Sequence, residues 1–325
     1  MLEAVGKVGG VPVRLAENEG IAFQGCIVLG LGFTLDSALA QEWIAADPRN
    51  AEVLFPYLNG EDLNSRPDTS SSRWVIDFGI RTEDEASSYP LPFERVRQLV
   101  KPERDKNKIA YRRDIWWRFA AWAPAMRRAI ADLSEVLAIA RISKTVMPLR
   151  ISTGPVMNEK TVVFATASYG DQALLSSSLH WAWTIKYTST MRTDINYSPS
   201  DVFVTLPRPK MTERLQAAGK ALDSERRETM RAHGLGLTKL YNLVHDPDVT
   251  EQSAPDIAHL RDVHEEVDKA VMAAYGWSDV PLGHGFHTYR QMTRWTISPE
   301  ASSEIVDRLL EENHRRARLE GSRHR

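Results

Sequence analysis

A dense block of basic side chains lies between residues 92 and 150. This segment carries 14 Lys and Arg against 6 Asp and Glu, whereas residues 1–91 carry 6 against 14 and the whole 325-residue chain has a formal net charge of −2. Clustered cations can neutralise phosphates, and counterion release then favours binding to a nucleic acid. A solvated helix of mixed charge gives the same composition, so the block alone leaves both interpretations open. Six of the cations, here called the basic strip, fall within 13 residues: Lys101, Arg104, Lys106, Lys108, Arg112 and Arg113.

The motifs of DNA-modifying catalysis are absent from the sequence. Methyl transfer to a base amino group requires an Asn/Asp-Pro-Pro-aromatic loop, which polarises the amino group of the flipped base, and none of the 17 prolines is adjacent to another. A glycine loop for S-adenosylmethionine has one weak candidate, VLGLGF at residues 28–33, with Asp47 downstream. No lysine follows an Asp or Glu by two positions, as a metal-dependent nuclease signature requires. We therefore expect no catalytic residue in this chain.

Cysteine and histidine offer no metal site either. Cys26 is the only cysteine, which excludes an internal disulfide, and no Cys/His cluster has zinc-ligand spacing. His284 and His287 lie in a glycine-rich turn, where structural hydrogen bonding is favoured over metal binding. The sequence has neither a signal peptide nor an apolar run that could cross a bilayer. A cytoplasmic protein with no membrane partner is the expectation.

The elements that must position these residues indicate an α+β fold. Apolar residues at helical spacing predict helices at 113–133, divided by Pro124, and at 174–184. A few helices among many short strands are typical of a mixed sheet. Short β-branched runs predict strands at residues 21–34, 73–80, 136–142, 146–151, 161–167 and 202–206.

The character of the chain changes after Pro207-Arg208-Pro209. Helices are predicted at about 211–232, 254–275 and 299–319, and a short strand pair is suggested near 284–296. The predicted organisation has four parts: a connector at 1–18, a mixed-sheet domain at 19–207, a small all-helical C-terminal domain at 208–320 and a disordered basic tail at 321–325.

One series of motifs is the most informative part of the chain. Residues 56–67 read PYLNGEDLNSRP, and SSRWVIDF at 71–78, LVKPER at 99–104, a Trp116-Trp117 pair and ISKTVMP at 142–148 follow in order. This series resembles the DNA target-recognition region of the MmeI-like (type IIL) restriction-modification proteins, and more distantly that of type IIG enzymes. The tail is similar to the helical C-terminal domain of the same family, with GLTKLYN at 236–242, AYGW at 274–277 and GHGFH at 283–287. The resemblance covers roughly residues 19–318, and the nuclease and methyltransferase domains of the family have no counterpart in it.

The resemblance also implies where DNA would be read. In the family, the neighbourhood of residues 141–150 carries the side chains that set the recognised base pairs. Arg and Lys suit guanine edges, Thr suits the thymine methyl group and Asn suits adenine. The implied base readers are Arg141, Lys144, Thr145, Arg150, Asn158 and Lys160. DNA backbone contacts are expected from Arg66 and the basic strip, and for each residue a surface charge without such a role is the alternative.

Two further groups are expected to be structural. Gly60 and Asp62 in the turn at 59–66 suit a scaffold role, because short polar side chains hold tight turns by bonding to the backbone. Trp116, Trp117 and Trp122 suit the core better than base stacking, because double-stranded DNA offers no unstacked base.

We therefore expect a sequence-specific recognition module for double-stranded DNA, serving an adenine-specific DNA methyltransferase in a restriction-modification or phage-defence system. The chain would hold no cofactor, and a separate catalytic subunit would bind S-adenosylmethionine. One alternative is a complete methyltransferase with an unrecognised site, which binding of S-adenosylmethionine would reveal. Another is a non-catalytic interaction remnant, favoured if the basic strip is paired internally.

Overall fold

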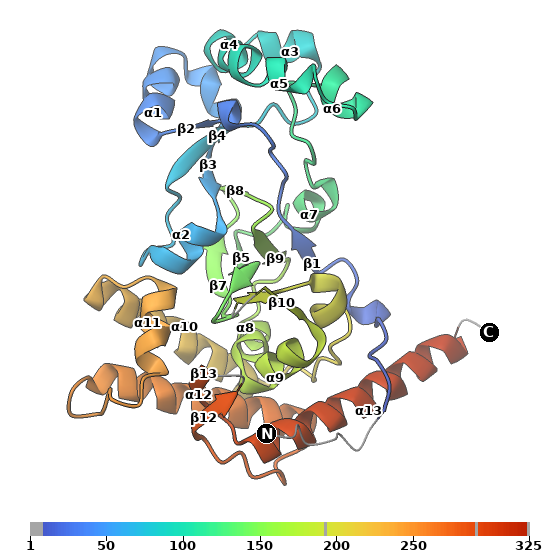
Figure 1. Cartoon of the computed structure of the whole chain (residues 1–325), viewed down its shortest axis with the longest axis vertical. Coiled ribbons are helices and arrows are strands. Elements are labelled where there is room, and N and C mark those ends of the chain that lie inside the picture. The colour runs from blue at the N-terminus through green and yellow to red at the C-terminus, as the bar shows by residue number, and fades with distance from the viewer. Residues whose placement is uncertain (1–8, 192–193, 290–291, 324–325) are drawn as a thin grey trace.

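The computed structural model describes residues 9–191, 194–289 and 292–323. The molecule is elongated, with short helices at one end, sheets in the middle and long helices at the other end (Figure 1). In the described part of the chain, no helix is both long and apolar enough to span a bilayer.

A four-stranded antiparallel sheet occupies the centre. In order across the sheet, its strands are β1 (Ala22–Gln24), β9 (Thr161–Phe164), β5 (Glu135–Ala140) and β7 (Leu149–Ser152). Every residue of β9 is buried, which explains its uninterrupted β-branched and apolar run.

Two smaller sheets flank the centre. One consists of β2 (Thr34–Leu35), β4 (Arg73–Ile76), β3 (Leu54–Leu58) and β8 (Val156–Met157), and its β3–β8 pair is parallel. The other consists of β10 (Ser189–Met191), β11 (Asp194–Asn196) and β6 (Ile142–Ser143), in which Asn196 of β11 pairs with Ile142 of β6.

Short helices cap the first half of the chain. Trp116 and Trp117 are buried in their core, as predicted, with ring centroids 5.8 Å apart. Trp122 is partly buried, and its indole donates a hydrogen bond to Asp77 at 3.3 Å. The helices are η1 (Ala16–Asn18), η2 (Leu31–Phe33), α1 (Ser37–Ala46), η3 (Pro48–Glu52), α2 (Gly60–Ser65), α3 (Glu83–Ser87), α4 (Pro90–Leu99), α5 (Lys101–Arg104), α6 (Ala110–Asp114) and α7 (Pro124–Ala129).

The part of the chain that follows residue 207, here called the C-terminal segment, packs against the central sheet domain through helices. Gly219 makes this approach close, because a Cβ atom there would lie 1.8 Å from the Tyr169 carbonyl oxygen. The helices of the second half are α8 (Tyr169–Ser176), α9 (Ser178–Tyr187), the π-helix η4 (Pro199–Phe203), α10 (Glu213–His233), α11 (Leu237–Val244), α12 (Pro255–Tyr275) and α13 (Pro299–Arg323). A hairpin of β12 (Gly285–Tyr289) and β13 (Met292–Thr296) lies where the short strand pair was suggested.

The α+β prediction is confirmed, and three local predictions are corrected. The helix predicted at 113–133 is interrupted because Ala121 pairs with Ile27, the amide of Ala121 donating to the Ile27 carbonyl at 3.0 Å. The strand predicted at 202–206 is replaced by η4, since the Asn18 side chain binds the Phe203 and Leu206 carbonyls that a neighbouring strand would otherwise satisfy. The tail predicted to be disordered is helical as far as Arg323, and residues 324–325 lie outside the described residues.

Candidate nucleic-acid interface

A groove of about 740 Å³ opens beside β6, between the sheets and α11. Three cations line it, Arg141, Lys160 and Lys239, and they outnumber the two carboxylates, Glu61 and Glu159. Amide and hydroxyl groups complete the polar lining: Asn64, Ser65, Asn196 and Thr238. A groove with donors and acceptors of this kind can form hydrogen bonds with base edges and phosphates.

Helix α2 forms one wall of the groove, and a capping box fixes its start. The Asn59 side chain accepts hydrogen bonds from the amides of Glu61 and Asp62, at 2.7 and 3.2 Å, and the Asp62 carboxylate accepts one from the Asn59 amide at 3.2 Å. A Cβ atom on Gly60 would lie 2.8 Å from the Lys160 carbonyl oxygen. Gly60 and Asp62 are therefore scaffold residues, as predicted.

Helix α11 forms the opposite wall and contacts α2 directly. A Cβ atom on Gly236, the residue before α11, would lie 2.3 Å from the Ser65 carbonyl carbon. This close approach places Thr238 and Lys239, in the first turn of α11, at the groove. The side chain of Lys239 is exposed.

The backbone brings two predicted base readers together. The Arg141 amide donates to the Lys160 carbonyl at 2.8 Å, and the Arg141 side chain donates to the Asn196 side-chain oxygen at 3.3 Å. Ile142 and Lys144 are exposed, whereas Ser143 between them is buried. Lys144 follows directly after β6, whose Ile142 lines the groove.

Three predicted base readers are buried instead. Arg150 is 4% exposed and donates to the Ala167 carbonyl at 2.9 Å and to Gln172 at 3.1 Å, while its guanidinium lies 4.0 Å from the Tyr169 ring centroid. Thr145 binds the Ser143 hydroxyl at 2.9 Å. The Asn158 side chain accepts from the Lys160 amide at 2.9 Å. In this structure all three stabilise the domain, and we remove them from the set of base readers.

The basic strip divides in a similar way. Arg104 is 2% exposed, donates to the Val28 and Leu29 carbonyls at 3.0 and 2.8 Å, and cannot also contact DNA. Burial, and then the nearby Arg112, lower the pKa of Arg104. Lys101 forms an ion pair with Asp105, and Arg113 forms one with Asp114, each at 2.9 Å.

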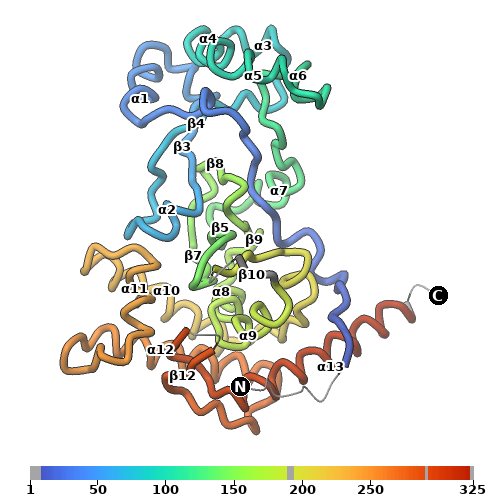
Figure 2. Tube along the Cα trace, viewed as in Figure 1, coloured from blue at the N-terminus to red at the C-terminus, as the bar shows by residue number. Residues whose placement is uncertain are grey.

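Three cations of the strip are left for a ligand. Lys106 and Lys108 are exposed, Arg112 is half-buried, and none of them forms an ion pair with a described residue. They lie around α5 and α6, at the end of the molecule opposite α11 and α12 (Figures 1 and 2). The structure therefore does not bring the strip and the groove into one site. Arg66, just after α2, is half-buried and donates to Ser70 at 2.8 Å.

The glycines of the candidate cofactor loop have a packing role. A Cβ atom on Gly32 would lie 2.5 Å from the Leu99 Cβ, and one on Gly30 would lie 3.2 Å from the Val100 side chain. Both glycines therefore allow η2 to approach α4 closely. Within the described residues, no three His, Cys, Asp or Glu side chains could together hold a metal ion. The His284 ring donates to the Asp268 carboxylate at 2.9 Å, in keeping with a structural role.

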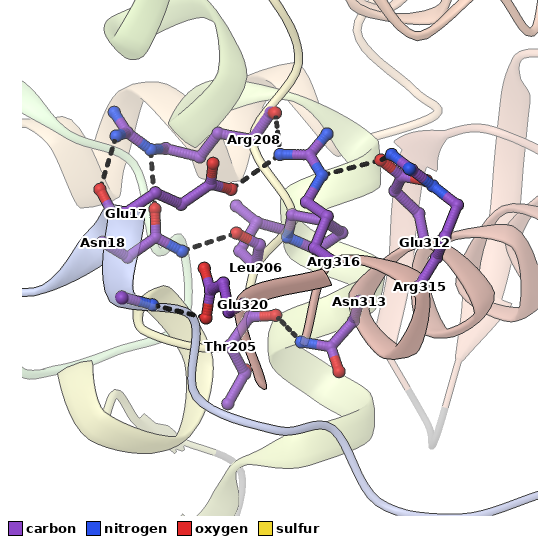
Figure 3. Close-up of polar contacts among 12 residues, drawn as sticks. Glu17, Asn18, Thr205, Leu206, Arg208, Glu312, Asn313, Arg315, Arg316 and Glu320 are labelled. Atoms are coloured by element: carbon purple, nitrogen blue, oxygen red, sulfur yellow. Dashed lines mark hydrogen bonds and ion pairs between the residues drawn. The ribbon is translucent and has the colours of Figure 1, made fainter. Parts of the chain in front are cut away.

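The segment predicted as a connector is tied to α13 over residues 9–18. The Val13 amide donates to Asn313 at 2.8 Å, and Asn313 donates in turn to the Thr205 carbonyl at 2.7 Å. Arg316 binds both Glu17, at 2.6 Å, and the Arg208 carbonyl, at 2.7 Å (Figure 3). These contacts join the start of the described chain, the end of the sheet domain and the last helix.

Several groove residues were missed at the sequence level. Ser65 and Asn196 come from separate segments, which the close approach of Gly236 to Ser65 and the pairing of Asn196 with Ile142 bring to the groove. Thr238 and Lys239 lie inside the GLTKLYN motif, so the signal was present but pointed to a domain rather than to a contact.

Comparisons with known proteins show the family and the fold of the chain. The chain matches the family described as "MmeI, target recognition domain" over residues 24–210, more than half of its length. Its fold is similar to that of the type IIL restriction-modification enzyme MmeI, solved in complex with DNA, with a TM-score of 0.64 and 16% identity over 97% of this chain and 38% of that one. The chain thus spans well under half the length of that enzyme. No curated protein sequence matches it. The match over residues 24–210 confirms the resemblance noted in the sequence: the chain belongs to the family of MmeI target recognition domains.

Proposed function

We propose that this chain reads the sequence of double-stranded DNA through the groove beside β6. The observation that carries the proposal is the placement of Arg141 and Lys160, whose backbones are hydrogen-bonded and whose side chains line one groove with Asn196. Arg and Lys donate to guanine O6 and N7, and Asn can pair with adenine in both directions. Lys144, exposed directly after β6, is the fourth proposed reader.

Backbone contacts would fix the register of the DNA. Lys239 of α11 lines the same groove as Arg141 and Lys160, and a phosphate bound there would neutralise its charge. Arg66, Lys106, Lys108 and Arg112 are proposed as outlying phosphate contacts, because each keeps some exposure to solvent. Phosphate contacts strengthen binding to every sequence alike, whereas contacts in the groove set the preference.

Catalysis would belong to a separate adenine methyltransferase that binds S-adenosylmethionine. The division of labour is supported by the sequence, which has no Pro-Pro loop, and by Gly30 and Gly32, which pack against α4. The solved relative is a restriction-modification enzyme, which supports a role in restriction-modification or phage defence. We propose domain boundaries at residues 18 and 207, as the sequence suggests.

Two observations bear on the alternatives. A complete methyltransferase needs a cofactor loop, and the one candidate loop is packed against α4. An interaction remnant gains some support from the basic strip, because Lys101, Arg104 and Arg113 are engaged internally. Three exposed or half-buried cations of the strip and the cations of the groove favour DNA binding over the remnant.

Selection from a randomised pool of DNA duplexes tests the proposal. The full chain should enrich a defined motif, and its affinity should fall as salt is raised. Equilibrium dialysis should show no binding of S-adenosylmethionine by the chain alone. Enrichment of no motif would refute sequence recognition, and binding of the cofactor would instead favour the complete enzyme.

A further inference from the structure

The loop between β6 and β7, residues 144–148, presents a single side chain to solvent; we call it the readout loop. Lys144 is exposed, whereas the other four residues, Thr145 to Pro148, are buried. Four side chains therefore anchor the loop, and one is left to contact a ligand.

The backbone of the readout loop is strained. Val146 has a φ of 49°, in the left-handed region that β-branched residues rarely adopt. The Thr145 amide donates to the Ser143 hydroxyl at 3.1 Å, which tightens the preceding turn. A strained backbone of this kind persists only where surrounding contacts hold it, and such positions cluster at functional sites.

Two buried arginines from the C-terminal segment hold the two ends of this loop. Arg294 of β13 donates to the Lys144 carbonyl at 2.9 Å, and Arg226 of α10 donates to the Pro148 carbonyl at 2.6 Å. Arg294 is 6% exposed and Arg226 is 1% exposed. Both lie beyond residue 210, where the match to the recognition domain ends.

Neither arginine forms an ion pair with a carboxylate of the described residues. Asp223, one turn before Arg226, forms its ion pair with Arg227 at 3.1 Å and interacts with Arg226 only through its charge. Arg294 lies 4.8 Å from the ring centroid of Trp181, and burial lowers its pKa to about 10, so it keeps its charge at neutral pH. A buried cation without a carboxylate partner is unfavourable, so the hydrogen bonds to the loop carbonyls are the contacts that explain its retention.

We propose that Arg226 and Arg294 are positioning residues that fix Lys144 for base reading, so that the C-terminal segment takes part in sequence discrimination. The inference rests on the proposed function, because it requires that Lys144 faces DNA. A hydrogen bond to a base edge weakens steeply when its angle or length changes. Release of the loop should therefore reduce discrimination at one base pair while leaving phosphate contacts unchanged.

The test compares Arg294→Met with the wild-type full chain in selection from randomised duplexes. We expect preference at one position of the motif to fall about tenfold, the order of one base contact, with the other positions unchanged. The slope of log affinity against log salt should stay the same, because Arg294 touches no phosphate. Unchanged preference at every position would overturn the inference.

Arg261→Met is the matched control. Arg261 is a buried arginine of the same segment that holds the carbonyls of Val244 and Val249, at 2.8 and 2.7 Å, and none of its hydrogen bonds reaches the readout loop. It should lower the melting temperature and leave the motif intact. Equal broadening of the motif by both variants would show general loosening and would also overturn the inference.

Val146→Gly keeps the test decisive if Arg294→Met fails to fold. Glycine adopts a positive φ freely, so this variant removes the strain and loosens the loop while both arginines remain. It should fold and should lose preference at the same position as Arg294→Met. If the folded variant retains the wild-type preference, the inference fails. If the wild type itself selects no motif, the proposed function has failed first.

Discussion

Lys144 and Arg150 stand six residues apart and meet opposite environments. Lys144 has no partner for its ammonium group among the described hydrogen bonds and ion pairs, whereas Arg150 has a carbonyl, an amide oxygen and an aromatic ring around it. A cation whose donors are already used inside the protein gains little from a base edge. Exposure therefore decides which of the predicted contacts remain available.

Lys144→Glu should change the preferred base at one position. The substitution replaces a donor by an acceptor, so preference should shift from guanine toward cytosine, with discrimination of about 1–3 kcal/mol. Selection from randomised duplexes, or methylated-site mapping after reconstitution with the methyltransferase, measures the shift. Lys220→Glu on the exposed side of α10 is the control for charge alone. An unchanged motif would remove Lys144 and leave Arg141 and Lys160.

Alanine at Lys106, Lys108 and Arg112 together should weaken binding to all sequences alike. Each lost phosphate contact should flatten the slope of log affinity against log salt by about 0.9. A salt titration of the full chain on a fixed duplex measures this slope. If the triple variant keeps the wild-type slope, the basic strip faces something other than DNA.

The sequence showed which basic residues lie near the proposed site, but it did not show which of them are exposed. The motif at 142–148 begins beside the groove, and Arg141, Lys144 and Lys160, which were predicted there, keep some exposure to solvent. The burial of Arg104 and Arg150 depends on carbonyls of Val28, Leu29 and Ala167, which are distant in the sequence. No local pattern shows that such carbonyls will need a donor.

Helix α8 of the sheet domain packs closely against helix α10 of the C-terminal segment at Gly219. Gly219 lies in the interior of α10, where alanine would ordinarily favour the helix by about 1 kcal/mol. Gly219→Ala should nevertheless destabilise the protein by about 1–3 kcal/mol or more, because its Cβ would lie 1.8 Å from the Tyr169 carbonyl oxygen.

Urea unfolding of Gly219→Ala and Gly321→Ala separates packing from helix propensity. Gly321 lies in α13 with no atom within 4 Å of an added Cβ, so alanine there should be neutral or slightly stabilising. Equal effects of the two substitutions would contradict the close packing of α8 and α10.

Elements with strong local signals were predicted well, and elements fixed by distant partners were not. Pro255 and Pro299 open α12 and α13 at their first positions, which made these starts readable. Residues 115–123 have apolar spacing typical of a helix, but the pairing of Ala121 with Ile27 prevails over that propensity. Helix α11 was missed because eight residues give too short a pattern.

Buried histidines make the stability of the whole molecule depend on pH. Burial lowers the pKa of His180 and of His264 to about 4, below the value of about 6.5 expected in the unfolded chain. Arg226 and Arg294 near His264 act in the same direction, and Asp268 opposes them. The unfolded chain therefore binds more protons between these values, and stability falls as pH decreases from about 6.5 to 4.

Urea unfolding at pH 7, 6 and 5 should show this loss. Near the middle of the window the slope should approach about 1.4 kcal/mol per pH unit for each histidine. His264→Gln keeps an acceptor for the Tyr241 hydroxyl, which lies 2.8 Å from His264, and should flatten the dependence. A variant with the wild-type slope would show that His264 is not buried in neutral form.

The hydrogen bonds from Arg226 and Arg294 to the readout loop affect how recognition domains can be exchanged between related proteins. A chimera that takes residues 19–207 from a relative would receive a new loop but keep Arg226 and Arg294. The carbonyls of the new loop would then have to accept hydrogen bonds from arginines that pack against a different loop sequence in this protein. Transplanting residues 19–320 as one unit keeps each loop with its own anchors. If the two arginines position the loop as proposed, the unit to exchange is the recognition domain together with the helices that follow it.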